Sequence, residues 1–421
     1  MMSRPPGVPS RTSTAKSIAL AAFGLFLAGC GGVVRHPLPA ELAEEAQVAG
    51  MSGIRSWGGE FSPAFQTDLV ESVRQARSIN PQGVVDANGY VNVLAISGGG
   101  AEGAFGAGLL CGWTQAGNRP TFKLVTGIST GALIAPFAFV GPEYDFVLQK
   151  FFTSVSTADI YTPRPLISVL AGTDGLTDTA PLARLLDQVV DEKLLAAVAQ
   201  AHRQGRRLYI GTTNLDAGRL VIWNMGAIAA SGQPTALTLF RTVMRASASI
   251  PVAFPPTYIS VQARGRTYDE MHVDGGTLTQ VFFYGDLVDL AAAARQAGAD
   301  RQTPARIYVI RNAQIKTDWQ TVKPRLLPIA SRAITGLLFS QGVGDLYRIY
   351  AITARDGIDF KLASIPDDYE SKAKEAFDRA EMTRLFDTAF ALARDGYPWR
   401  PLPPGMKERP DAATQPAATQ P

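Results

Sequence analysis

The sequence runs twice in succession through the same order of a buried strand, a glycine-rich turn and a helix. Residues 92–96 form a short apolar run between turn residues, which is typical of a buried strand, and a glycine-rich turn at 98–103 leads from it into a helical pattern. The order recurs at residues 122–126, where the turn at 127–131 precedes a second helical pattern. Strands joined through helices lie parallel to one another. The sequence therefore predicts an α/β fold, with a mostly parallel sheet in a three-layer α/β/α core.

Strand and helix patterns continue to alternate beyond residue 140, so the main α/β domain is expected at residues 86–315. After about residue 315 the pattern is chiefly helical, and residues 316–400 are expected to form a helical C-terminal extension packed on the core. Further strands are expected at 208–213, 220–224, 258–262, 266–269 and 307–311, and further helices at 181–190, 237–248, 287–297, 328–354 and 371–393.

Both ends of the chain are expected to lie outside the folded part. Residues 1–29 are typical of a signal peptide, because basic residues precede an apolar run that is too short to span a bilayer. The run ends in Leu-Ala-Gly-Cys, which resembles the lipobox of bacterial lipoproteins and makes Cys30 the expected lipidated N-terminus. The alternative is an ordinary signal peptide that is cleaved nearby. Residues 30–85 are expected to be a tether and N-terminal extension, and residues 401–421 a disordered tail.

The charge of the chain gives no reason to expect nucleic acid as a partner. The formal net charge of +3 falls to zero when the three basic residues of the signal peptide are removed, and no run of lysine or arginine remains. Cys111 is the only cysteine besides Cys30, so acylation of Cys30 leaves no intramolecular disulfide. Attachment to a membrane would then depend on the acyl chains.

Ser129 is the candidate nucleophile, because it stands between Gly127 and Gly131 at a turn from a strand into a helix. A serine on such a tight turn projects its hydroxyl from the edge of the sheet, and the two glycines permit the close packing that the turn requires. The alternative is that Ser129 only caps the following helix.

The candidate anion site is the glycine loop formed by Gly98, Gly99, Gly100 and Gly103. Its backbone amides and the N-terminus of the following helix can stabilise the negative charge of a tetrahedral intermediate. The same glycines also fit a dinucleotide-binding fingerprint, which requires an acidic residue about twenty positions further on. No aspartate or glutamate stands between Gly103 and Glu143, which argues against a nucleotide cofactor.

Asp274, followed by Gly275 and Gly276, is the candidate base. To accept the proton of Ser129 it needs a raised pKa, which partial burial would supply. A plain Asp-Gly turn is the alternative. A Ser-His-Asp triad remains a further alternative through His272, which lies two residues before Asp274 and is expected instead to support the loop.

With these motifs in this order, the chain resembles the patatin-like phospholipases, specifically their bacterial lipoprotein members. Further matching segments occur at residues 177–182, 212–218, 246–251 and 254–256. The resemblance implies a Ser-Asp dyad of Ser129 and Asp274, an oxyanion hole of the Gly99 and Gly100 amides, and no metal or cofactor. Glu102 departs from the family pattern, since many members carry arginine or lysine there.

The expected activity is that of a phospholipase A or other acyl esterase that works through an acyl-enzyme. Its expected partners are an acyl-ester lipid and, through the lipid anchor, a bacterial membrane. Gly31 after Cys30 favours the outer membrane. The alternative function is that of a non-catalytic envelope lipoprotein that binds lipid or protein. The sequence indicates no particular protein partner.

Overall fold

The computed structural model describes residues 35–165, 167, 173–299, 303–317 and 319–407. The expected signal peptide, the lipidation site Cys30 and most of the expected tail lie outside these residues. Among the described helices, none is long and apolar enough to cross a membrane.

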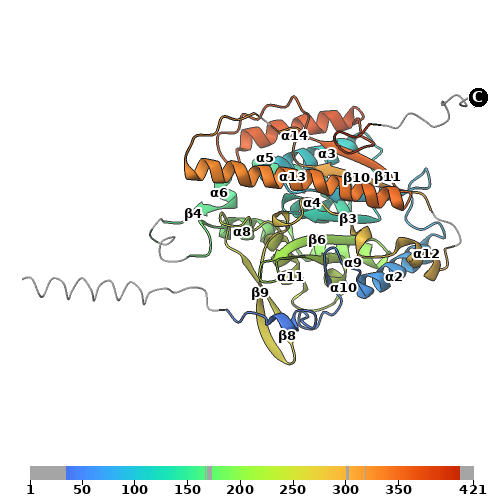
Figure 1. Cartoon of the computed structure of the whole chain (residues 1–421). Coiled ribbons are helices and arrows are strands. Elements are labelled where there is room, and N and C mark those ends of the chain that lie inside the picture. Colours follow the sequence, from blue (N-terminus) through green and yellow to red (C-terminus); the bar gives the residue numbers. More distant parts are fainter. Residues whose placement is uncertain (1–34, 166, 168–172, 300–302, 318, 408–421) are drawn as a thin grey trace, which may run out of the picture.

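In the described part of the chain, nine strands form one sheet in which five neighbouring strands are parallel (Figure 1). The parallel strands are, in spatial order, β11 (Asp359–Ser364), β10 (Ala305–Arg311), β2 (Val91–Ile96), β3 (Leu124–Ile128) and β6 (Arg207–Asn214). The antiparallel strands are β7 (Arg219–Asn224), β1 (Arg55–Trp57), β9 (Arg266–Asp274) and β8 (Thr257–Ala263). A separate ladder joins β4 (Thr162–Pro163) to β5 (Thr177–Asp178).

Helices cover both faces of the sheet, so the fold is the expected three-layer α/β/α arrangement. One face carries α3 (Gly103–Gln115), α4 (Thr130–Val140), α5 (Asp145–Ser154), α6 (Thr157–Ile160), α8 (Ala180–Val189), α9 (Glu192–Arg203), α10 (Met225–Ala230), α11 (Ala236–Ser247) and α14 (Arg379–Arg394). The other face carries α2 (Pro63–Ile79), α12 (Leu290–Gln296) and α13 (Leu326–Arg355). Side chains alternate between the two faces along each parallel strand, as in β2, where Leu94 and Val93 belong to different apolar clusters.

Helices α3 and α14 pack unusually close together because small residues line their contact. A Cβ atom added to Gly108 of α3 would lie 2.2 Å from the carbonyl oxygen of Phe386, and one added to Gly112 would lie 2.2 Å from that of Phe390. The two glycines stand one helical turn apart and let the backbone of α14 approach that of α3. Helix α14 is thereby an integral part of the first helical layer.

The structure differs from the sequence-based expectation at both flanks of the main domain. Within residues 30–85, α2 buries Phe65 and Leu69 against the sheet, so this segment contains a helix of the core rather than only a tether. Within residues 316–400, β11 pairs with β10 and extends the central sheet, so the extension is not only helical. The helix expected at 371–393 begins only at Arg379, because Asp378 caps it by accepting hydrogen bonds from the amides of Ala380 and Glu381.

Candidate active site

Ser129 lies on a strained turn between the end of β3 and the start of α4. Its φ of 55° and ψ of −124° are unusual for a residue with a side chain. The Ser129 amide donates a hydrogen bond of 3.0 Å to Ser247 Oγ, whose hydroxyl donates one of 2.7 Å to the carbonyl of Gly211. Ser247 therefore braces the turn from α11, a role that the sequence did not reveal.

The glycines on both sides of Ser129 are required by packing. A Cβ atom on Gly127 would lie 2.4 Å from the carbonyl oxygen of Gly131, and one on Gly131 would lie 2.3 Å from that of Ile96. The turn thus fits between two strands and a helix only because both residues lack side chains.

The structure brings Ser129 and Asp274 together: Ser129 Oγ lies 2.6 Å from Asp274 Oδ2. The strand pairing explains this contact. The last residue of β3, Ile128, pairs with Gly211 of β6, and the next residue of β6, Thr212, pairs with Asp274 of β9. Strands β3 and β9 therefore lie on the same side of β6 and meet end to end, so the residue after β3 faces the last residue of β9.

Asp274 is buried, and burial raises its pKa from 3.8 to about 7, against the opposing effect of hydrogen bonds from Ser129 and the Gly276 amide. The Gly276 amide donates a hydrogen bond of 2.7 Å to Asp274 Oδ1, which leaves Oδ2 directed at Ser129. Gly275 allows close packing, since a Cβ atom there would lie 2.5 Å from the carbonyl oxygen of Gly211. Near neutral pH the carboxyl group can accept and return a proton.

The glycine loop lies directly against Ser129. A Cβ atom on Gly98 would be 3.1 Å from Ser129 Cβ, and the Gly98 amide donates to the carbonyl of Gln280. Gly99 and Gly100 have φ values of 155° and 57°, and within the described residues neither amide has a protein acceptor.

The start of α3 also packs against the turn, since a Cβ atom on Gly103 would lie 2.2 Å from Thr130 Oγ1. Thr130 is the first residue of α4, so its amide is an unpaired helix N-terminal donor beside the nucleophile. No motif in the sequence indicated this donor.

The geometry excludes a Ser-His-Asp triad through His272. The ring is fully buried and both of its nitrogens have other partners: Nε2 lies 3.1 Å from Glu270 Oε2, and Nδ1 lies 2.9 Å from Thr212 Oγ1. His272 thus ties β9 to β6, which agrees with the expected supporting role.

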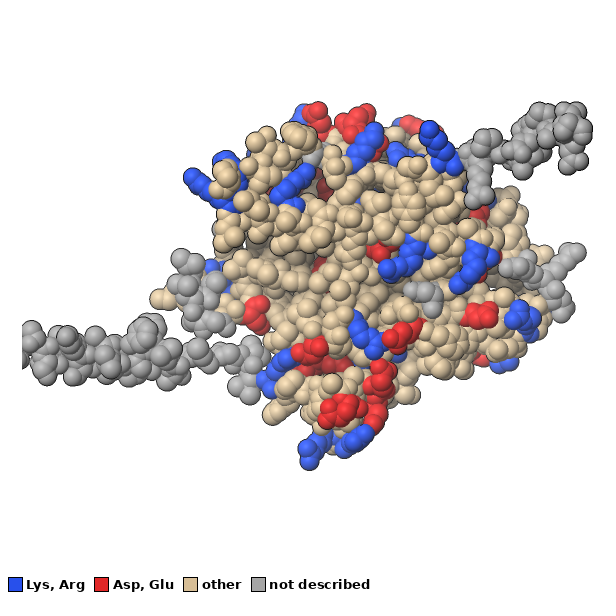
Figure 2. Space-filling model, in the orientation of Figure 1, with Lys and Arg blue, Asp and Glu red and all other residues tan. Residues whose placement is uncertain are grey.

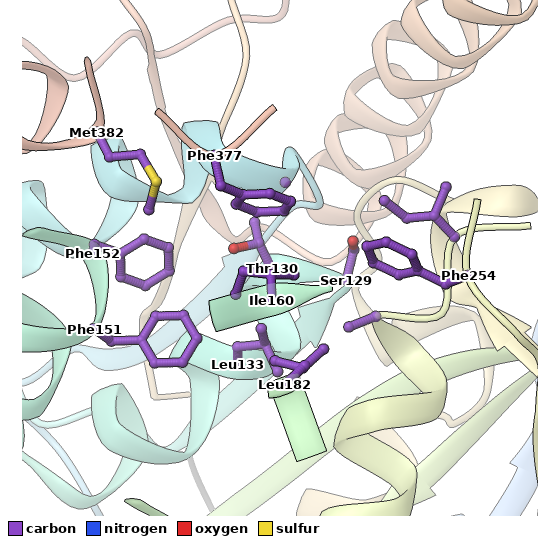
Figure 3. A pocket seen from close by; sticks show the side chains of 13 residues that line it. Ser129, Thr130, Leu133, Phe151, Phe152, Ile160, Leu182, Phe254, Phe377 and Met382 are labelled. Atoms are coloured by element: carbon purple, nitrogen blue, oxygen red, sulfur yellow. The ribbon is translucent and has the colours of Figure 1, made fainter. Parts of the chain in front are cut away.

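An apolar cavity extends from Ser129 into the first helical layer (Figure 3); the space measures about 430 Å³ only when the open solvent at its mouth is counted with it. Ser129 and Phe254 stand at one side of it, and Phe151, Phe152 and Met382 at the other. Its wall also includes Gly100, Thr130, Leu133, Ile160, Leu182, Ala248, Ile250 and Phe377.

Residues 246–256, for which core packing was the preferred expectation and the wall of the substrate site the alternative, serve as both. Ala246, Ala248 and Phe254 belong to the buried apolar cluster of the first helical layer, and Ala248, Ile250 and Phe254 line the cavity. Glu102 is exposed and does not line the cavity, although it lies in the glycine loop. Among the described residues, no group of three or more His, Cys, Asp or Glu side chains is placed to hold a metal ion.

One family model matches part of the chain. The family model for patatin-like phospholipases matches residues 94–284, which include the glycine loop, Ser129 and Asp274. Among solved structures, the chain is similar to VipD from Legionella pneumophila, with 11% identity and a TM-score of 0.30 over 73% of this chain and 67% of that chain. It is also similar to human GIVD cytosolic phospholipase A2, with 10% identity and a TM-score of 0.33 over 77% of this chain and 54% of that chain. Likenesses of this size carry no argument on function. No curated protein sequence matches the chain.

Proposed function

We propose that the patatin-like phospholipase domain of this chain, residues 94–284, hydrolyses acyl esters of lipids through a dyad of Ser129 and Asp274. The observation that carries the proposal is the 2.6 Å contact between Ser129 Oγ and Asp274 Oδ2 at the mouth of an apolar cavity. A serine hydroxyl is a weak nucleophile unless a base accepts its proton. Asp274 is placed for this task, and its raised pKa matches the proton transfer.

In the proposed reaction, Asp274 accepts the Ser129 proton while Ser129 Oγ forms a bond to the ester carbonyl carbon. The amides of Gly99 and Gly100, with that of Thr130, stabilise the negative oxygen of the tetrahedral intermediate. Asp274 then returns the proton to the departing alcohol as the ester bond breaks. A water molecule attacks the acyl-enzyme in the same manner, its proton passing to Asp274 and then to Ser129, and the fatty acid leaves.

The cavity supports an acyl chain, rather than a polar head group, as the group held within the protein. Phenylalanine, leucine, isoleucine and methionine side chains make up most of its wall, and an apolar chain gains free energy on leaving water for such a wall. The head group would lie outside, beyond the glycine loop. We infer that the substrate is a glycerophospholipid or another acyl-ester lipid.

The proposed location rests on the N-terminal sequence. Cleavage before Cys30 and acylation of that cysteine would hold the enzyme at a bacterial membrane, and Gly31 favours the outer membrane. Metabolic labelling with a palmitate analogue tests this proposal, since Cys30→Ser should abolish the label.

A fluorophosphonate probe tests the nucleophile. The purified chain should react with the probe, Ser129→Ala should not, and the exposed control Ser260→Ala should react as the original chain does. A chain that folds, fails to react and releases no fatty acid from phospholipid vesicles would instead be a lipid- or protein-binding lipoprotein. Profiling of released fatty acids and lysolipids then identifies the position of the ester that is cleaved.

A further inference from the structure

Helix α13 is much longer than the strands that it connects. It links β10 to the parallel strand β11 and therefore runs antiparallel to both. Its 30 residues measure about 45 Å, whereas the six residues of β11 measure about 20 Å. About half of the helix therefore extends beyond the sheet. The helix ends beside the start of β11, so the part that extends beyond the sheet is its N-terminal half. This half lies at the edge where the parallel strands end, and Ser129 lies at the same edge.

The burial of α13 shows the same division. Its second half packs on the sheet through Asp345, Leu346 and Ile349. Among the described side chains of residues 326–340, none is buried. We call residues 326–340 the overhanging half of α13.

The exposed surface of the overhanging half is apolar along one side. Leu326 is 82% exposed, Ile334 56% and Leu337 70%. Together with Ile329, Ala330 and Ala333 they follow the spacing of a single helical face. An apolar helix face in water needs a partner, because each such side chain is stabilised by leaving water.

The charges within the overhanging half and the segments next to it in sequence have one sign. Between Trp319 and Gly344 the charged residues are Lys323, Arg325 and Arg332, and no acidic residue occurs. In the space-filling view, the surface along α13 is mostly uncharged, and acidic and basic side chains occur together above and below it (Figure 2). Trp319, at 97% exposure, stands before the helix. An apolar helix face with flanking basic residues and a tryptophan matches the composition of helices that lie in the interface of anionic bilayers.

The buried half of α13, which continues directly from the overhanging half, contacts the candidate active site through Asp345. Asp345 Oδ2 accepts a hydrogen bond of 2.7 Å from the Gln280 amide. Gln280 in turn accepts from the Gly98 amide and donates a hydrogen bond of 2.7 Å from Nε2 to the carbonyl of Gly276. Further apolar surface lies at the cavity, where Ile250 lines the wall and is 38% exposed.

We propose that the overhanging half of α13 and Trp319 lie in the surface of an anionic phospholipid bilayer and hold the mouth of the cavity against it. A second copy of the chain fits less well, because a twofold contact through this face would bring the same basic side chains together. The proposal deepens the proposed function, since it names the surface from which a lipid ester would enter. The membrane contact itself does not depend on turnover.

An environment-sensitive fluorophore tests the contact directly. The full chain carries Cys30→Ser, which removes the acyl anchor, and Leu337→Cys, which receives the fluorophore. Cys111 does not compete for the fluorophore, because it is buried and burial raises its pKa to about 12. Vesicles of phosphatidylcholine and phosphatidylglycerol at about 2:1 should shift the emission to the blue. A probe at Gln204→Cys, just before the start of β6 and so at the opposite edge, should not respond.

Three results of this measurement would overturn the proposal. The probe at 337 stays unchanged with vesicles if the face does not enter lipid. If the emission of the probe at 337 is already blue-shifted without vesicles and the shift grows with protein concentration, a second copy covers the face. If that shift is independent of concentration, another part of the same chain covers it.

Charge variants on α13 provide the matched comparison. Leu337→Glu should weaken vesicle binding by about tenfold relative to Thr335→Glu, which adds the same charge on the opposite side of the same helix. Both positions are exposed, so the fold should persist. Hydrolysis of a short soluble ester should be equal in all variants. If the original chain does not hydrolyse the soluble ester, only the proposed function is contradicted. If all variants bind vesicles equally, only the membrane contact is contradicted.

Discussion

Replacing Asp274 by asparagine should stabilise the protein at neutral pH while it removes the base. Burial raises the pKa of Asp274 from 3.8 to about 7, so between these pH values the folded chain binds a proton that the unfolded chain has released. Stability must then fall as the pH rises through this window. A difference of about three pKa units corresponds to about 4 kcal/mol above pH 7. Asparagine has no proton to lose, and its amide can donate to Ser129 while its oxygen still accepts from the Gly276 amide.

The assay is urea unfolding of both proteins between about pH 4 and pH 8. Their difference in unfolding free energy should be small near pH 4 and increase towards about 4 kcal/mol near pH 8, because all other titrating groups contribute equally to both. Asp216→Asn is the control of opposite sign. The hydrogen bond and charge of Arg35 lower the pKa of Asp216, so this variant should lose stability at neutral pH and recover relative to the original as the pH falls. A difference for Asp274→Asn that is constant, or largest in acid, would refute the reasoning.

Four further predictions concern the base, the turn, the cavity and the helical layer. With a short soluble ester, kcat/KM should rise with pH to a plateau with a midpoint near 7 and fall about tenfold per pH unit below it, because only ionised Asp274 can accept the Ser129 proton; a flat profile between about pH 5 and 8 would contradict this role. Ser247→Ala should lower kcat about five- to thirty-fold, since it leaves the Ser129 amide and the Gly211 carbonyl unpaired at a cost of about 1–2 kcal/mol, and Ser247→Thr should restore part of the loss in the same assay. Phe377→Ala should shift the preference in a series of esters towards longer acyl chains because it removes part of the cavity wall. An unchanged preference would mean that the acyl group of the substrate does not bind in this cavity. Gly108→Ala should reduce the free energy of unfolding, measured in urea, by about 1–3 kcal/mol, because the added methyl group would collide with α14. Gly117→Ala, at an exposed turn with positive φ, shows for comparison the effect of backbone strain alone.

The parts of the fold that sequence predicts well are those specified by neighbouring residues. The turn at Ser129 and the glycine loop follow from glycines at fixed positions after an apolar run, and the helices after them begin where expected. The alternation of strands and helices likewise predicts the three-layer order. Helix α2 was not predicted, since residues 30–85 were expected to form a tether and N-terminal extension without a helix of the core. Strand β11 was missed because its six residues lie between two long helical patterns.

Other parts of the site depend on segments distant in sequence. Phe377 stands alone in the polar run at 371–378, so no local pattern indicates that it reaches the cavity of Ser129. The brace from Ser247 depends on where α11 lies above the sheet, and the overhang of α13 depends on the length of the strands beside it. The order of motifs suggested Ser129 and Asp274 as partners, but it could not predict that their side chains are in hydrogen-bonding contact.

The contact between Ser129 and Asp274 depends on the register of a strand that contains neither residue. Strand β6 pairs with β3 up to Gly211 and with β9 from Thr212 onward, so it aligns the ends of two strands that approach from opposite directions. A shift of one residue along β6 would move Asp274 by about 3.3 Å and turn its side chain to the other face of the sheet. The buried hydrogen bond between His272 and Thr212 opposes such a shift, because it joins β9 to β6 and would have to break. Glu270 lies on the same strand as His272 and holds the other ring nitrogen. The histidine next to the dyad therefore contributes through the register of the strand that carries the base, and this explains why a histidine so close to Asp274 has no direct contact with Ser129.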